Sequence, residues 1–304
     1  MKTILRFKSL SEFHSYSNLI KPEHPLISLV DYSKVHYPSD TDEIKWIQDF
    51  YSIGLKRNVS EKFNYGQQNY DFDEGVLSFV APQQTLNIQI NQDVKVNATG
   101  WLLLIHPDFL WNTPLATLIK KYDFFGYAVN EALFLSEKEE NNLVALFKNI
   151  QKEYQSKIDK FSQNIIISQI ELLLNYAERY YERQFITRKI TNHQILTRLE
   201  ERLNHYFNNA EILANGIPTV SQIANDLNLS PNYLSSTLKL ISGQSTQQHI
   251  HNKLIENAKE KLSTTELSVS EIAFELGFEH PASFSKLFKT KTNLSPLEFR
   301  QSFN

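Results

Sequence analysis

Side chains that carry catalytic or metal chemistry are sparse in this sequence of 304 residues. It contains no Cys, which excludes disulfides, a thiol nucleophile and Cys-ligated zinc. It has no phosphate-binding loop, dinucleotide-binding glycine turn, nucleophile elbow or H-E-x-x-H zinc motif. His14, His24 and His36 are scattered singly, as is His106, and His249 and His251 stand two apart in a predicted helix, on different faces. The sequence therefore predicts no enzyme, no metal site and no cofactor.

A different chemistry is indicated by a repeat near the end of the chain. Residues Val220–Leu229 align with Val269–Phe278, and the two copies share Val, Ser, Ile, Ala and Leu at matching positions. A second matching pair follows, Leu234–Lys239 with Phe284–Lys289. Internal repeats indicate an architecture of similar units. We therefore expect two copies of one small fold in this region.

Each copy has the pattern of two short helices joined by a tight turn. From Val220, apolar residues recur at i, i+3, i+4 and i+7, which places them on one helix face. Pro231 and Pro281 suit the first position of the next helix in each copy. This is the pattern of the DNA-binding helix-turn-helix. A helix predicted over 246–262, about 25 Å long, would hold the two units about one DNA turn apart, ~34 Å.

Sequence motifs in both copies match a known family. They are Ile223-Ala224, Leu229–Ser235, Gly243–Ser245, Ala258, Ile272–Phe278, Phe284–Lys289 and Ser295-Pro296. On these motifs, residues from about 215 to 304 resemble the DNA-binding domain of AraC/XylS-type transcriptional regulators. The resemblance implies a one-component transcriptional regulator that binds double-stranded DNA through two helix-turn-helix units, at 220–241 and 269–292. It also implies RNA polymerase as a partner if the protein is an activator.

Matching positions to this family indicates which side chains contact DNA. We expect them on the exposed faces of the second helix of each unit. They are Asn232, Tyr233, Ser235, Ser236 and Lys239 in the first unit, and Ala282, Ser283, Ser285, Lys286 and Lys289 in the second. Lys286 is the best candidate for reading a guanine edge, and Lys289 for a phosphate contact.

Two features depart from the family pattern. Ser236 stands where family members usually carry Arg or Lys, and residues 211–304 hold eight Lys or Arg against nine Asp or Glu, a net charge of −1. A DNA-binding domain is commonly basic, so we expect weak non-specific binding. These departures support an alternative, an adaptor that has lost DNA binding and contacts protein. Glu271 and Glu275, one helical turn apart, are interpreted as a solvated face.

The first part of the chain predicts a β-rich domain. Apolar runs of strand length at 26–30, 76–81, 86–90 and 101–105 are separated by Gly and Pro turn signals. We therefore predict an α+β protein, in which a small β-barrel-like, cupin-like domain with flanking helices (1–135) precedes an all-α tandem helix-turn-helix domain (215–304).

The resemblance implies that the N-terminal domain binds a small organic effector in a barrel pocket. Barrel mouths are common ligand sites lined by aromatic and a few polar side chains. The polar candidates are Gln67, Gln68, Asn69 and Gln83. An alternative is a cupin-like metal enzyme fused to a DNA-binding domain, which would need a cluster of metal ligands.

Between these domains, residues 136–209 contain neither Gly nor Pro and predict three amphipathic helices. The first opens with a capping box, Ser136 followed by Glu139. The others are expected at 160–183 and 192–207. Three helices with apolar faces are more than one small β-rich domain needs to cover it. We therefore expect the segment 136–210 to form a homodimer.

The whole-chain composition is that of an ordinary soluble protein. Hydrophobic residues make up 41%, and the formal net charge is −3. No apolar run approaches the roughly 18 residues of a membrane-spanning helix. We therefore expect a cytoplasmic protein with no membrane partner.

Overall fold

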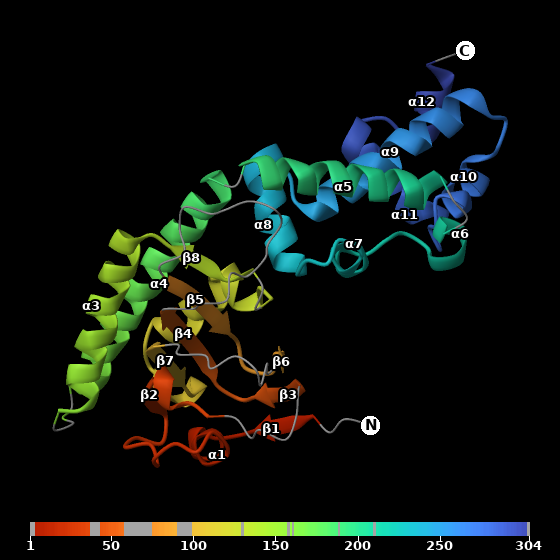
Figure 1. The fold of residues 1–304 in the computed structure, drawn as a ribbon. Helices are drawn as coiled ribbons and strands as arrows, with labels where there is room; N and C mark the ends of the chain where they lie inside the picture. Colours follow the sequence, from red (N-terminus) through yellow and green to blue (C-terminus); the bar gives the residue numbers. More distant parts are fainter. Residues whose placement is uncertain are drawn as a thin grey trace. The chain divides into compact units, whose positions relative to one another are not determined.

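The computed structural model describes residues 4–36, 43–57, 75–89, 99–128, 131–156, 159, 161–187, 189–208 and 211–302. Two compact units make up the chain, Met1–Thr187 and Arg188–Asn304 (Figure 1). The first unit contains sheets and helices, and the described part of the second is helical. The predicted α+β class is therefore confirmed.

A five-stranded antiparallel sheet forms the centre of the first unit. Its strands lie in the order β2 (Ile27–Asp31), β7 (Thr99–Ile105), β4 (Tyr51–Arg57), β5 (Gly75–Val80) and β8 (Leu133–Leu135). Side chains of the central strands, such as Ile53, Leu77 and Leu103, are fully buried. Gly100 lies where β7 approaches β4 so closely that a Cβ atom would stand 2.0 Å from the Leu55 carbonyl oxygen.

A smaller sheet joins β1 (Leu5–Phe7), β3 (Glu43–Gln48) and β6 (Thr85–Gln89), with β3 in the middle. Helix α1 (Leu10–Tyr16) packs beside it, and aromatic side chains including Phe7, Phe13 and Trp46 fill the space between. Within the described residues the strands form these two sheets and no closed barrel. The expected barrel shape is therefore not seen there, because the eight strands divide between two sheets.

Short helical turns connect these strands. They are η1 (Tyr32–Lys34), η2 (Pro107–Leu110), α2 (Leu115–Leu118), η3 (Ile119–Lys121) and η4 (Asp123–Gly126). Phe124 and Phe125 of η4 are buried against Phe79 of β5. The aromatic residues of this segment thus contribute to the core of the unit.

Two long helices complete the first unit, α3 (Glu137–Tyr154) and α4 (Ser162–Thr187). The predicted capping box at Ser136 and Glu139 is present at the start of α3. Arg183 of α4 forms an ion pair with Glu139, with its Nη2 2.5 Å from Oε2. The Gln184 side chain accepts a hydrogen bond of 2.8 Å from the Phe134 amide of β8, which fixes α4 to the sheet.

The second unit consists of eight helices in its described residues. They are α5 (Lys189–Asn208), α6 (Glu211–Asn215), α7 (Val220–Asp226), α8 (Pro231–Ser242), α9 (Thr246–Thr264), α10 (Val269–Glu275), α11 (Pro281–Thr292) and α12 (Pro296–Gln301). Their buried contacts include Ile223, Leu234, Ile250, Ile272 and Phe284, all with no exposed surface. The helix predicted over 246–262 is confirmed as α9.

Helix α5 packs with the second unit, against α6, α7, α8 and α9. The sequence pattern predicts that this helix forms one segment, 136–210, with the two helices before it. Its apolar residues Ile195, Leu199 and Leu203 are buried. An amphipathic stripe shows that a helix has a buried face but not which neighbour covers it. No helix among the described residues is long and apolar enough to span a membrane.

Candidate nucleic-acid interface

The two repeat units have the same local structure. Helices α7 and α10 are both 7 residues long, and α8 and α11 are both 12. Capping boxes begin both first helices, Thr219 with Gln222 and Ser268 with Glu271. Proline occupies the first turn of both second helices. The repeat in the sequence is therefore a repeat in structure.

The turns between the paired helices also correspond. Asn228 in the first unit and Gly277 in the second both adopt left-handed backbone, with φ of 58° and 77°. The Leu229 amide donates to the Ala224 carbonyl at 2.9 Å, and the Phe278 amide donates to the Ala273 carbonyl at 3.0 Å. These bonds close each first helix as a Schellman motif does. The chain then turns sharply into the second helix.

Packing of α8 determines which predicted DNA contacts are accessible in the first helix-turn-helix unit. Asn232 and Lys239 are exposed, while Ser235 and Ser236 are half-buried. Tyr233 is only 5% exposed, so its expected place on the exposed face is wrong. The buried face of α8 includes Tyr233 and Thr237 beside the fully buried Leu234 and Leu238, so it is wider than the leucines alone indicate. The Ser235 hydroxyl lies 3.0 Å from that of Thr246 and joins α8 to α9.

The second helix-turn-helix unit presents more polar surface on its second helix, α11. Ala282, Ser283, Lys286 and Lys289 are exposed, and Ser285 is half-buried. On the opposite side of α11, Phe284 and Phe288 are fully buried. The Lys291 ammonium instead donates to the Asn252 side chain of α9 at 3.2 Å. Lys286 and Lys289, the two lysines of α11 that the sequence predicts as DNA contacts, therefore both lie on exposed surface.

Helix α9 contacts both helix-turn-helix units. Near its start, His249 Nε2 lies 2.8 Å from the Ser242 hydroxyl at the end of α8, and burial lowers the pKa of His249. Further along, Lys261 pairs with Glu275 of α10 at 2.6 Å. Glu271, the other member of the acidic pair, serves in the capping box with Ser268, whose hydrogen bonds lower its pKa. Both acids of this pair therefore have structural contacts within the chain.

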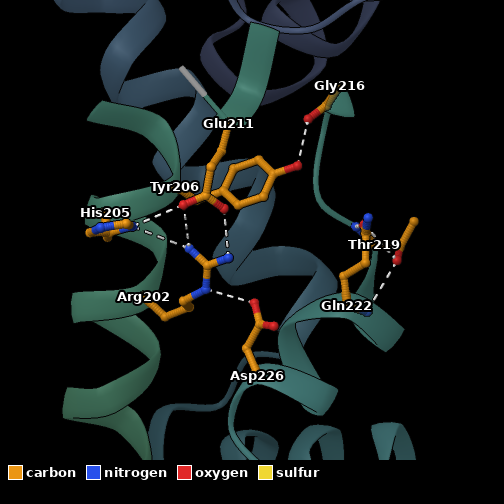
Figure 2. Close-up of polar contacts among 8 residues, drawn as sticks. All are labelled: Arg202, His205, Tyr206, Glu211, Gly216, Thr219, Gln222 and Asp226. Atoms are coloured by element: carbon orange, nitrogen blue, oxygen red, sulfur yellow. Dashed lines mark hydrogen bonds and ion pairs between the residues drawn. The ribbon is translucent and has the colours of Figure 1, made fainter. Parts of the chain in front are cut away.

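A cluster of charges attaches α5 to α6 and to α7, the first helix of the first helix-turn-helix unit (Figure 2). Arg202 pairs with Glu211 of α6 at 2.8 Å and with Asp226 of α7 at 2.6 Å. The hydrogen bond from Arg202 lowers the pKa of Glu211. Arg198 Nη2 donates to the Leu227 carbonyl at 3.0 Å. These contacts were not identified from the sequence, because they join residues of α5, α6 and α7 that only the fold brings together.

The expected effector-binding residues of the first unit are only partly described. Gln67, Gln68 and Asn69 lie outside the described residues. The Gln83 side chain is bonded to Arg6 and Asp49, on the first unit's smaller sheet. Among the described residues no three His, Asp or Glu side chains are placed to hold a metal ion.

Comparisons with known proteins agree with the fold of the second unit. Residues 223–302 match the family model described as a helix-turn-helix domain. The resemblance found in the sequence is therefore confirmed for this part of the chain.

Individual matches also fall on regulators. The raffinose operon transcriptional regulatory protein RafR of Pediococcus pentosaceus is 36% identical over 28% of this chain and 30% of its own length. A helix-turn-helix-type transcriptional regulator from Pseudoalteromonas carrageenovora is 32% identical over 33% of this chain and 55% of its own length. The chain thus spans about a third to a half of the length of these relatives.

Among solved structures, the C-terminal domain of the two-component response regulator YesN from Fusobacterium nucleatum matches at 30% identity. The matched region covers 34% of this chain and 93% of that structure, with a TM-score of 0.30.

Proposed function

We propose that this chain, whose residues 223–302 match a helix-turn-helix domain, is a sequence-specific DNA-binding transcriptional regulator. The observation that carries the proposal is the pair of structurally equivalent units, each with a second helix that buries its apolar side and exposes polar residues. Such a helix fits the major groove, where side chains read base edges. Both named relatives are described as transcriptional regulators.

The DNA-contacting residues of this proposal follow the structure. Lys286 and Lys289 of α11 and Lys239 of α8 supply positive charge on exposed surface. The proposed set also includes the exposed Asn232, Ala282 and Ser283 and the half-buried Ser235, Ser236 and Ser285. With three cations in this set, the phosphate contribution to binding is small, and base contacts must supply much of the selectivity.

Selection from a random DNA library tests the proposal. The purified full chain is expected to enrich a bipartite motif, with one half for each unit. Enrichment of no motif, together with capture of a protein partner by the second unit, would support the adaptor alternative instead. A bound metal found by elemental analysis of the pure protein would support the fused metal enzyme.

We further propose that the first unit controls DNA binding by taking a small organic effector. Support comes from its separate core, which the helix-turn-helix units do not need for their own packing. An effector that favours the DNA-bound state must bind more tightly when operator DNA is present, since coupling is reciprocal. Calorimetry with a metabolite panel, with and without the selected DNA, measures this. Equal affinities in both conditions would contradict effector control.

Self-association is proposed through α4. Phe161, Ile165, Leu172 and Ile186 are 43% to 56% exposed. Ile165, Leu172 and Ile186 stand at i, i+7 and i+21 of α4, so they share one side of the helix, on which the exposed Arg179 also lies; Phe161 directly precedes the helix. A two-fold contact pairs this stripe, which we call the α4 stripe, with its own copy. A dimer would present four helix-turn-helix units, and RNA polymerase is the further partner if the protein activates transcription.

A further inference from the structure

Two glycines of the second unit touch backbone to backbone. Gly216 lies between α6 and α7, at the entry to the first helix-turn-helix unit, whereas Gly277 forms the turn of the second. A Cβ atom on Gly277 would lie 2.9 Å from the carbonyl carbon of Gly216 and 3.0 Å from its Cα. Both contacts are with backbone, which cannot move aside as a flexible side chain does. Only glycine therefore fits at position 277 in this arrangement.

The repeat shows that backbone conformation alone does not demand this glycine. The equivalent turn of the first unit uses Asn228 at a φ of 58°, and Asn tolerates left-handed backbone. At the ends of α8 and α11 the choice is reversed, with Gly243 in the first unit and Asn293 in the second. At each of these two left-handed positions, one copy of the repeat therefore has Gly and the other has Asn. What distinguishes Gly277 is its contact with Gly216.

The segment that leads to Gly216 also contacts the first helix-turn-helix unit. Arg202 of α5 pairs with Asp226 of α7, and Arg198 of α5 bonds the carbonyl that follows it. The Tyr206 hydroxyl donates to the Gly216 carbonyl at 3.1 Å, so the same helix anchors the glycine (Figure 2). Helix α5 and residues 211–216, which together we call the bracket, therefore provide a connection between the two helix-turn-helix units in addition to α9.

We propose that the bracket fixes the spacing between the two recognition helices, α8 and α11, through the contact of Gly216 with Gly277. This inference rests on the DNA-binding function proposed above. A single linking helix resists stretching but leaves twisting and bending between the units. A second connection removes those motions, so the pair reads half-sites at one separation. Gly216, Gly277 and Tyr206 are positioning residues, since they set where base-contacting helices lie.

The repeat supplies a matched pair of variants for the test. Gly277→Asn and Gly243→Asn each place Asn at a left-handed position, with φ of 77° and 73°. A Cβ atom at Gly243 would meet nothing within 4 Å, whereas one at Gly277 meets Gly216. The full-length variants are compared on DNA that carries the two half-sites of the wild-type motif at its selected spacing, and with one or two base pairs added or removed.

The wild type and Gly243→Asn are expected to prefer the selected spacing equally. Gly277→Asn is expected to lose at least about fivefold of that preference, the lower end of typical coupling effects, while keeping its base preferences within each half-site. An unchanged spacing preference in a folded Gly277→Asn protein would overturn the proposal. Circular dichroism and thermal melting establish folding.

A milder variant keeps the proposal testable if Gly277→Asn fails to fold. Tyr206→Phe removes the hydrogen bond to Gly216 and adds no atoms, and a smaller loss of spacing preference is expected. Wild-type preference in Tyr206→Phe would then contradict the bracket. A wild type that selects no motif at all would instead refute the DNA-binding function itself, so the two failures are distinct.

Discussion

Lys286 and Lys291 lie on the same helix, α11, but their side chains have different surroundings. Both lysines are exposed, but the Lys291 ammonium donates a hydrogen bond to Asn252 of α9. Lys286→Ala should weaken binding to the selected DNA by about 1–3 kcal/mol and relax preference at one base pair. Lys291→Ala is the matched control, because it removes the same charge away from the proposed contact. Fluorescence anisotropy on matched and single-substituted duplexes measures both, and equal effects of the two substitutions would exclude a base contact by Lys286.

We expect a second residue, His14 of α1, to make the unit Met1–Thr187 sensitive to acid. Its ring is buried, Nδ1–H donates to the Ile20 carbonyl at 2.5 Å, and Nε2 therefore accepts from the Ser28 hydroxyl at 3.0 Å. Burial lowers the pKa of His14 below its ordinary value of 6.5, an effect partly offset by the bond to Ile20. The unfolded chain thus binds the proton more readily. Stability contributed by neutral His14 is present above pH 6.5 and is lost as the pH falls below it.

His14→Asn keeps a donor near the Ile20 carbonyl but cannot titrate in this range. The variant should be less stable than the wild type at pH 7.5 because it leaves space in the core. Its melting temperature should fall less between pH 7 and pH 5. Parallel melts of wild type and variant across this range provide the measurement, and identical pH dependence would assign the acid sensitivity elsewhere.

At the scale of elements, α3 and α4 of the first unit differ in exposed apolar surface. The α4 stripe consists of four exposed apolar side chains, whereas no large hydrophobic side chain of α3 is exposed, and exposed apolar side chains that share one side of a helix can mark an interface. Leu172→Glu should shift a dimer to monomer, because it would bury a carboxylate in the contact. Lys152→Glu, on an exposed position of α3, should leave the association unchanged. Sedimentation velocity of the full chain at micromolar concentration decides, and a dimeric Leu172→Glu protein would exclude the stripe.

Elements also show how far the sequence leads and where it stops. Strands β2, β5, β6 and β7 and helices α3, α4 and α9 were predictable because each has a clear apolar period with recognisable ends. Strand β4 was missed because Ser52 and Gly54 separate its apolar residues Tyr51, Ile53 and Leu55, so that they form no continuous run. The place of α5 could not be predicted, since its stripe is compatible with either unit. Tyr233 was misplaced because its burial depends on packing between helices, which spacing within one helix does not specify.

For the whole molecule, the sequence revealed the tandem units but not what joins them. The repeat and its motifs are local, so they can be recognised from neighbouring residues. The Arg202 cluster and the contact of Gly216 with Gly277 join residues distant in sequence, and neither has a local signature. These contacts place α5 and α6 together with the helix-turn-helix units in one compact unit, which begins well before the matched residues 223–302.

The central claim is that both helix-turn-helix units bind one DNA duplex at the same time. A hydroxyl-radical footprint of the full chain on its selected DNA tests this most directly. The predicted result is two protected segments on one side of the duplex, about one helical turn apart, with the segment read by α11 weakened in Lys286→Ala. A single protected segment, or protection with no sequence preference, would contradict the claim.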